Sequence, residues 1–329
     1  MSAQPPWLAS QVQALLAQPG HAWLLAGPSG LGQFELALAL ARAWLCEQPQ
    51  AHGACGHCAS CHAIDVHTHA DLSMLLPETT ALRLAWPLGD QAQDEIDSKK
   101  RKPSKEIRVD AMRSMLEFAQ RTSGRGRGKV VLIFPAERMN QVSANALLKT
   151  LEEPAGPLRF VLASEAAHQL PATIRSRCLV HTMAWPEPDL ALHWLVSQGL
   201  SADLALASLR AAGGRAQDAL QFAAMAELWA QVPRAVQRGD VGFFADWSAA
   251  QLIDGLQKLC HDVLTFKAGG LPRFFSAADL PATAGSWAVL TGWAKQLAHS
   301  RRTIEHPFQA GLLQEALIQQ AQMALNSKP

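Results

Sequence analysis

The sequence predicts an α/β domain built on a parallel sheet, followed by a region that contains only helices. Short apolar runs alternate with segments of helical periodicity from residue 22 to about Met183. Strands that alternate with helices in this way form parallel sheets covered on both faces. After Met183 the periodicity is helical throughout. A chain of 329 residues is long enough for two or three domains.

Each element follows from its local pattern. The apolar run 22–26 is a predicted strand that stops at glycines, and apolar residues at helical spacing predict a helix at 34–45. Further strands are predicted at 71–76, 130–134 and 160–163, and further helices at 107–121 and 143–151. The last helix ends before Pro154, because proline cannot continue a helix. The polar, charged stretch 78–106 is predicted to be a flexible surface insertion.

Composition limits the kinds of partner and compartment. A hydrophobic fraction of 49% and a charged fraction of 17% describe a globular protein with much apolar surface to bury. With 29 basic and 28 acidic residues, the chain has no overall attraction to nucleic acid, so any DNA contact must be local. Since the first residues lack a signal-peptide pattern and no apolar run reaches eighteen residues, we expect a cytoplasmic protein.

The loop that follows the first strand has the glycine spacing of a phosphate-binding loop, with Gly27, Gly30 and Gly32. In that motif a lysine reaches the phosphates and the next hydroxyl holds magnesium, whereas here Gln33 carries no charge and Phe34 has no oxygen. The backbone amides could still bind an anion, and a purely structural glycine turn is the alternative. We therefore predict a degenerate phosphate loop, with ATP binding by this chain not expected.

A second catalytic element is also missing. In ATPases with this loop, a later strand ends in an acidic pair that binds magnesium and activates water, but the predicted strand 130–134 runs into Phe134 and Pro135. Glu137 lies too late in the turn to be assumed equivalent. Loss of both elements favours a protein that keeps the fold without the turnover.

Three later segments carry a family resemblance. They are NALLKTLEEP at 145–154, FVLAS at 160–164 and IRSRC at 174–178. In this order they resemble the bacterial clamp-loader family of AAA+ proteins, over roughly residues 20–183. Alignment to the family places Phe134 and Pro135 where active members have an Asp-Glu pair.

The resemblance implies a domain plan. An AAA+ domain with a P-loop-type parallel sheet is expected at 1–183, with a zinc-module insertion at about 46–69. A small helical lid domain is expected at 184–226, and an all-α collar domain for oligomerisation at 227–329. The lid of active members carries an arginine that senses nucleotide. Here Gln217 stands at that place and Arg215 lies nearby.

Cysteines suggest a metal site. Cys55, Cys58 and Cys61 are spaced too tightly for a disulfide framework and suit a metal in a reducing compartment. Together with Cys46 they have the spacing of the zinc module in the clamp-loader family. Four thiolates complete a tetrahedral Zn²⁺ and leave no open position, so the resemblance implies a structural site. Nearby histidines remain alternative ligands: His52, His57, His62, His67 and His69.

By the same resemblance, Arg177 in the motif Ser176-Arg177-Cys178 is an arginine finger that acts in trans on the ATP site of a neighbouring subunit. A guanidinium is permanently charged and can stabilise a transferring phosphoryl group, an effect of about 10³ to 10⁵ in rate. An ordinary surface ion pair is the alternative role for this arginine.

The leading hypothesis is a DNA polymerase III clamp-loader subunit that is not an enzyme by itself. The implied partners are the motor subunits γ or τ and the δ subunit in a hetero-oligomeric ring, with the sliding clamp and primed DNA. One alternative is an active motor subunit like γ or τ with an unusual loop. Another is a zinc-dependent nucleic-acid-binding module.

Two basic clusters are the local candidates for DNA contact. One comprises Lys99–Lys102 with Lys105, and the other comprises Arg125, Arg127 and Lys129. A charge run in a polar insertion is more often simply solvated, so both roles stay open.

Overall fold

A computed structural model describes residues 5–281, 285–304 and 309–327. The chain divides into two compact units, Met1–Leu190 and Ala191–Pro329. In the described part of the chain, no helix is long and apolar enough to cross a membrane.

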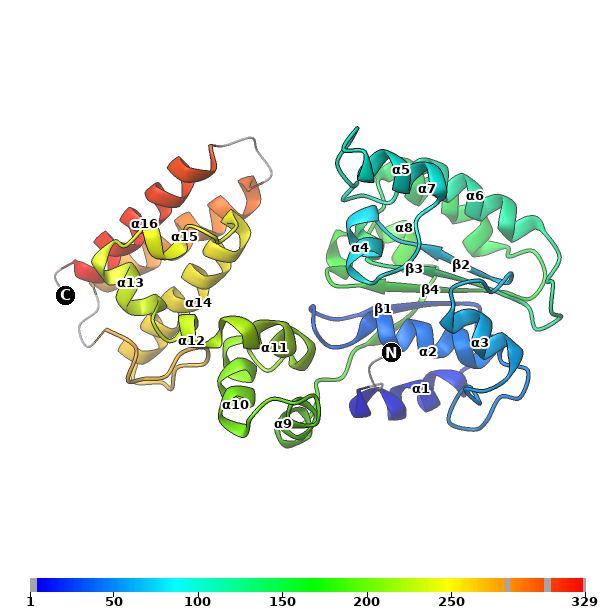
Figure 1. The fold of residues 1–329 in the computed structure, drawn as a ribbon, viewed down its shortest axis with the longest axis horizontal. Helices are drawn as coiled ribbons and strands as arrows, with labels where there is room; N and C mark the ends of the chain where they lie inside the picture. The colour runs from blue at the N-terminus through cyan, green and yellow to red at the C-terminus, as the bar shows by residue number, and fades with distance from the viewer. Residues whose placement is uncertain (1–4, 282–284, 305–308, 328–329) are drawn as a thin grey trace. The chain divides into compact units, whose positions relative to one another are not determined.

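The first unit is built on a parallel sheet with helices on both faces (Figure 1). Its strands are β1 (Ala22–Ala26), β2 (Leu72–Leu75), β3 (Lys129–Ile133), β4 (Leu158–Ser164) and β5 (Leu179–Thr182). Their order is β2-β3-β4-β1-β5, and every neighbouring pair is parallel. The predicted α/β fold class with a parallel sheet is therefore confirmed.

The helices of this unit cover the two faces in separate groups. They are α1 (Ala9–Leu16), α2 (Gln33–Leu45), α3 (Ala59–Asp65), α4 (Glu78–Arg83), α5 (Asp90–Asp97), α6 (Val109–Gln120), α7 (Gln141–Glu152) and α8 (Ala172–Arg175), with short 3₁₀ turns η1 (Pro6–Leu8), η2 (Ala136–Arg138) and η3 (Ala167–Gln169). Helices α1, α2 and α3 lie on one side of the sheet, and α6, α7 and α8 lie on the other (Figure 1).

Strand β3 is apolar on both of its faces because helices pack on both sides of the sheet. Val131 and Ile133 belong to the core shared with α6 and α7, while Val130 packs with Ala41 and Leu45 of α2. Successive side chains of a strand point to opposite faces, so a strand between two helical layers must be apolar throughout. Full burial of each large apolar side chain contributes about 1.5–3 kcal/mol.

The insertion 78–106, whose predicted flexibility stays a prediction, contains regular structure. It holds the two short helices α4 and α5, and only 6% of Glu78 is exposed. The Glu78 carboxylate accepts hydrogen bonds from the Arg101 guanidinium, from the Ser104 backbone N–H at 2.8 Å and from Arg108 Nη1 at 3.4 Å. The sequence shows the charges of this segment, but only the tertiary structure shows that opposite charges meet around a nearly buried carboxylate.

We predict that Glu78→Gln destabilises the first unit. The hydrogen bonds from Arg101, the largest cause, hold the pKa of Glu78 at about 2. Because the folded-state pKa lies below the unfolded one, this stabilisation is complete above the unfolded pKa of about 4.3 and is lost as the pH falls toward 2. Thermal unfolding at pH 7 should show a loss of about 3 kcal/mol, and this difference should shrink at pH 3.

Glu95→Gln is the matched control for that measurement. Glu95 also binds Arg101, at 2.7 Å, but its side chain is 31% exposed. An exposed pair of this kind contributes about 0–1 kcal/mol. Equal effects of the two substitutions would contradict the role assigned to Glu78.

The second unit is entirely helical in its described residues. After α9 (Pro188–Ser197), which crosses the unit boundary, it contains α10 (Ala202–Ala211), α11 (Ala216–Phe222), η4 (Ala223–Met225), α12 (Ala226–Trp229), α13 (Val232–Arg238), η5 (Gly242–Phe244), α14 (Ala249–Lys267), α15 (Trp287–Thr303) and α16 (Ala310–Asn326). The division of the helical region into a lid at 184–226 and a collar at 227–329 stays a prediction.

Aromatic side chains fill the core of this unit. Trp229 stacks on Phe275 with ring centroids 4.5 Å apart, and Trp247 lies parallel to Trp229 at 6.3 Å. Trp293 is also buried, whereas Trp287 is 49% exposed. The structure thus assigns three tryptophans to the core, which the sequence alone could not do.

A buried carboxylate fixes the chain beside this core. Asp262 of α14 is fully buried and accepts the backbone N–H groups of Arg273, Phe274 and Phe275 at 2.7–2.9 Å. The Arg273 guanidinium in turn donates to the carbonyl of Gly213 at 2.9 Å. These bonds satisfy a charge that would otherwise be costly to bury.

Candidate functional site

The glycine loop at the carboxyl end of β1 is filled by one of its own side chains. The Gln33 amide, with the residue only 2% exposed, donates to the carbonyl oxygens of Gly27 and Pro28 at 2.7 and 2.6 Å. A phosphate-binding loop directs backbone donors at its anion. Here two loop carbonyls accept from the internal Gln33 amide, which carries no positive charge for a phosphate.

Two residues that the family resemblance aligns with magnesium-binding positions are in contact with each other. The rings of Phe34 and Phe134 lie 5.5 Å apart, and the two residues are 9% and 4% exposed. Phe34 occupies the place of the hydroxyl of the motif, and Phe134 occupies the first of the two acidic places. An apolar contact therefore stands where a magnesium ion would need oxygen ligands.

The chain segment before α1 covers the same loop. The Trp7 indole N–H donates to the Leu31 carbonyl at 2.9 Å. Gly32 begins α2 with φ of +97°, and a Cβ at this position would come within 2.9 Å of Leu8. The predicted loop glycine is thus required both by its backbone conformation and by close packing.

Glu137 has a structural partner. It lies in η2 and accepts hydrogen bonds from the Ser164 hydroxyl at 2.7 Å and from the Glu165 backbone N–H at 3.1 Å. The carboxylate therefore ties η2 to the end of β4.

The four predicted metal ligands converge. The ligand atoms of Cys46, Cys55, Cys58 and Cys61 all lie within 4.8 Å of one another. Cys46 Sγ is 3.8 Å from Cys58 Sγ and 3.8 Å from Cys61 Sγ. A tetrahedral Zn²⁺ with bonds of about 2.3 Å separates its sulfurs by about 3.8 Å. The cluster therefore fits a metal ion, and a structural zinc is compatible with it.

The backbone supports this cluster. The N–H groups of Cys55 and Cys61 donate to the sulfurs of Cys46 and Cys58 at 3.3 and 3.4 Å, as metal thiolates require of their surroundings. Burial, followed by hydrogen bonding to Cys58, raises the pKa of the Cys61 thiol to about 12. Metal binding must displace such protons, so it strengthens as the pH rises. Among the described residues, the metal-binding group contains none of the five candidate histidines.

Arg177 lies just after α8 and is 31% exposed at its side chain. Its Nε donates to Glu152 Oε1 at 2.7 Å, a second guanidinium nitrogen also contacts Glu152, and Nη1 donates to the Thr173 carbonyl at 2.8 Å. The arginine is therefore accessible but held within its own chain. Glu152 was missed as a partner, although it lies inside the matched NALLKTLEEP segment.

The structure describes both residues considered for the lid sensor position. Gln217 stands on α11, and the nearby Arg215 is engaged by Asp218, with Nε 2.6 Å from Oδ2. Arg215 therefore has a local structural partner.

Three of the eight basic residues considered for DNA contact have acceptors within the chain, namely Arg101, Arg125 and Lys129. Lys129 is only 4% exposed and donates to the carbonyls of Phe118 and Ala119 at 2.8 Å, at the end of α6. Arg125 pairs with Glu47 at 3.0 Å. Lys129 is thus excluded as a DNA contact in this structure, because its ammonium is used to cap a helix.

Comparison with known proteins decides the family. The family model described as DNA polymerase III, delta subunit, matches residues 8–186. The chain belongs to this family. The match covers the glycine loop, the cysteine cluster and Arg177, so the family resemblance expected from the sequence is confirmed.

Similar proteins of known name point to the same family. The chain is 39% identical over 179 residues to DNA polymerase III subunit delta′ of Pseudomonas aeruginosa, which covers 54% of this chain and 48% of the relative. It is 36% identical over 215 residues to subunit delta′ of Escherichia coli K12, covering 64% and 58%. The matched segments thus span about half the length of these relatives.

A solved structure extends the likeness of fold to the whole chain. A DNA polymerase III gamma subunit-related protein from Thermotoga maritima superposes with a TM-score of 0.51 at 16% identity, covering 97% of this chain and 99% of that one. Such a likeness supports the AAA+ type of fold alone.

Proposed function

We propose that this chain is a delta′-type subunit of a DNA polymerase III clamp loader that has lost ATP hydrolysis of its own. The contact between Phe34 and Phe134 carries the proposal, because it puts two rings where magnesium would bind. The Gln33 amide inside the glycine loop adds independent support. Without magnesium and a lysine, the γ-phosphate of ATP lacks its main stabilising charges.

In this proposal Arg177 acts on a neighbour. Its guanidinium is accessible and follows a short helix at the surface of the first unit. The ion pair with Glu152 is exposed, so exchanging that carboxylate for a phosphate of a neighbouring subunit's ATP costs little. The neighbour would be a γ or τ motor subunit, and the assembly with δ would load the sliding clamp on primed DNA.

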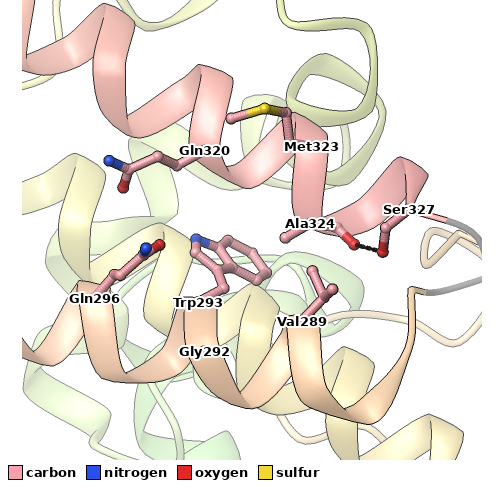
Figure 2. Close-up of a pocket in the computed structure, with 8 residues that line it drawn as sticks. All are labelled: Val289, Gly292, Trp293, Gln296, Gln320, Met323, Ala324 and Ser327. Atoms are coloured by element: carbon pink, nitrogen blue, oxygen red, sulfur yellow. Dashed lines mark hydrogen bonds between the residues drawn. The ribbon is translucent and has the colours of Figure 1, made fainter.

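The second unit offers a surface for assembly. Figure 2 shows a pocket of about 440 Å³ between α15 and α16, in which Trp293 of α15 faces α16. Met323 at its rim is 65% exposed, and the buried indole nitrogen of Trp293 has no hydrogen-bond partner among the described residues. A hollow between two helices that offers Trp293 and Met323 together with Gln296 and Gln320 suits a partner helix with an apolar stripe and polar flanks. This supports a collar role for the region.

ATP hydrolysis by the purified chain tests the proposal. Alone, the chain should release no phosphate above background with magnesium and ATP. Mixed with γ or τ, δ, the clamp and primed DNA, it should support DNA-stimulated hydrolysis. The double substitution Gln33→Lys with Phe34→Thr should not restore turnover by the chain alone, because Phe134 and Pro135 still replace the acidic pair.

Two results would favour the alternatives. Magnesium-dependent turnover by the unmodified chain alone would indicate an active motor subunit. Salt-sensitive DNA binding by the chain alone that disappears on chelation would indicate a zinc-dependent nucleic-acid-binding module.

A further inference from the structure

A second hollow in the first unit combines positive charge with aromatic rings. It has a volume of about 870 Å³ and lies at the amino ends of β1 and β4. The glycine loop lies at the other end of β1, one strand length away, so the two sites are distinct. The side chains important here are Trp23, Trp44, Arg127 and Arg159.

The aromatic part of this pocket is fixed. The rings of Trp23 and Trp44 lie 4.7 Å apart, and the Arg159 guanidinium lies 5.4 Å from the centre of the Trp44 ring. A cation over an indole face is stabilised by about 0.5–2 kcal/mol and keeps its orientation. Arg159 is therefore held in place by stacking.

The second arginine is brought close by a strained loop. Gly128 has φ of +86°, and a Cβ there would come within 2.4 Å of the Pro157 carbonyl oxygen. Lys129 N–H also donates to this carbonyl at 3.0 Å. Only glycine permits this approach, and it places Arg127 on the same pocket as Arg159.

The two arginines face no acid in the pocket. Among the described residues that line it, none is Asp or Glu. Burial, and then the positive charge of Arg127, lower the pKa of the Arg159 guanidinium from its usual value. Guanidinium groups nevertheless stay protonated in proteins. Two like charges that share a pocket without an acid favour an anionic ligand.

The hydrogen-bonding groups and the size of the pocket limit the chemical class of its ligand. Trp23 is 1% exposed, and its indole N–H has no hydrogen-bond partner among the described residues. The buried Trp23 indole shapes the pocket wall, and the two guanidiniums offer donors only, which suits a group made of acceptors alone, such as a phosphate. A volume of about 870 Å³ is that of a site for an organic molecule larger than inorganic phosphate.

We propose that this pocket binds a phosphate group carried on a larger organic molecule, through Arg127 and Arg159. A free nucleotide and the 5′-phosphate end of a single-stranded DNA share this chemistry. Phosphate is preferred over a single carboxylate because its charge of about −1.5 to −2 and its three oxygens match two guanidiniums. The inference is independent of Arg177 and of the assembly proposed above.

Binding to the full chain tests this proposal with three probes. They are a short single-stranded oligonucleotide with a 5′-phosphate, the same oligonucleotide with a 5′-hydroxyl, and adenosine monophosphate. Labelling the oligonucleotides at their 3′ ends allows anisotropy measurement, and calorimetry reports the nucleotide. A lost hydrogen bond to a charged group corresponds to a tenfold or greater change in affinity. We therefore expect Arg127→Gln and Arg159→Gln each to weaken binding by about tenfold or more.

Arg113→Gln is the matched control. Arg113 is exposed on α6, with its side chain 73% accessible and one weak pair to Asp110 at 3.5 Å, so this change should leave binding unaltered. Arg127 is itself exposed, and its replacement leaves the stacking of Arg159 on Trp44 intact, so a folding defect is not expected. Unchanged thermal unfolding of the Arg127 variant verifies this.

The outcomes separate the two sources of phosphate. A preference for the 5′-phosphate over the 5′-hydroxyl that is lost in the arginine variants assigns a DNA end. Binding of adenosine monophosphate alone, weakened by the same variants, assigns a free nucleotide. The proposal is overturned if no probe binds, if binding ignores Arg127 and Arg159, or if Arg113→Gln weakens it equally. Tighter binding of an acidic peptide than of both phosphate probes would also overturn it.

Discussion

If Arg177 acts as the proposed arginine finger, Arg177→Ala is expected to abolish most ATP hydrolysis at the neighbouring subunit's site. An arginine finger contributes about 10³ to 10⁵ in rate by stabilising charge on the transferring phosphoryl group. The DNA-stimulated ATPase rate of the reconstituted complex should therefore fall by the contribution of that site. Clamp loading should fall as well. Phosphate release measures the ATPase rate, and clamp retention on primed DNA measures clamp loading.

Two variants separate a finger from a structural arginine. Arg175→Ala removes an exposed charge from α8, two residues away, and should leave the ATPase unchanged. Glu152→Gln removes the carboxylate that holds Arg177, so it should keep or raise activity, since the guanidinium becomes free to engage phosphate. If Arg177→Ala left the complex fully active, or if Glu152→Gln inactivated it equally, the ion pair with Glu152 would be the function of Arg177.

Loss of the zinc proposed for the cysteine cluster is expected to have the largest effect on stability. Structural zinc in isolated modules contributes on the order of 10 kcal/mol of folding free energy. Cys58→Ser, or chelation, should lower the unfolding temperature of the first unit by about 20 °C or more, because each kcal/mol corresponds to about 2–4 °C in a domain of this size. Calorimetric unfolding and the zinc content of the purified protein are the two measurements.

Cys260→Ala provides the control for a lost sulfur. Cys260 is 2% exposed in the second unit and lies outside the cysteine cluster. Its replacement should lower stability by a cavity effect without changing the zinc content. A Cys58→Ser protein that retained stoichiometric metal would contradict the ligand assignment. A metal-free protein of unchanged stability would contradict the structural role.

Much of the first unit could be predicted from sequence because the relevant signals are local. The apolar runs at 22–26 and 130–134 became β1 and β3 with bounds within a residue. Apolar periodicity is set by residues that are close in the chain, so it can be read without the tertiary structure. The contacts within the insertion 78–106 could not be predicted, for the opposite reason. Its stability comes from Arg101 and Arg108 meeting Glu78, far apart in sequence.

Sequence by itself determined what chemistry is absent. Gln33, Phe34, Phe134 and Pro135 offer no charge, hydroxyl or carboxylate at the positions where the family resemblance places them. It also supplied the cysteine spacing and the family motifs.

Only the tertiary structure decided which contacts these side chains make. It places the ring of Phe34 against that of Phe134 and directs the Gln33 amide toward the carbonyl of Gly27. It also buries the Lys129 ammonium against the last carbonyls of α6. It also places Arg127 beside Arg159 with no acid between them. Such contacts join segments that are distant in the chain, and no local pattern encodes them, because packing of the sheet and its helices sets these distances.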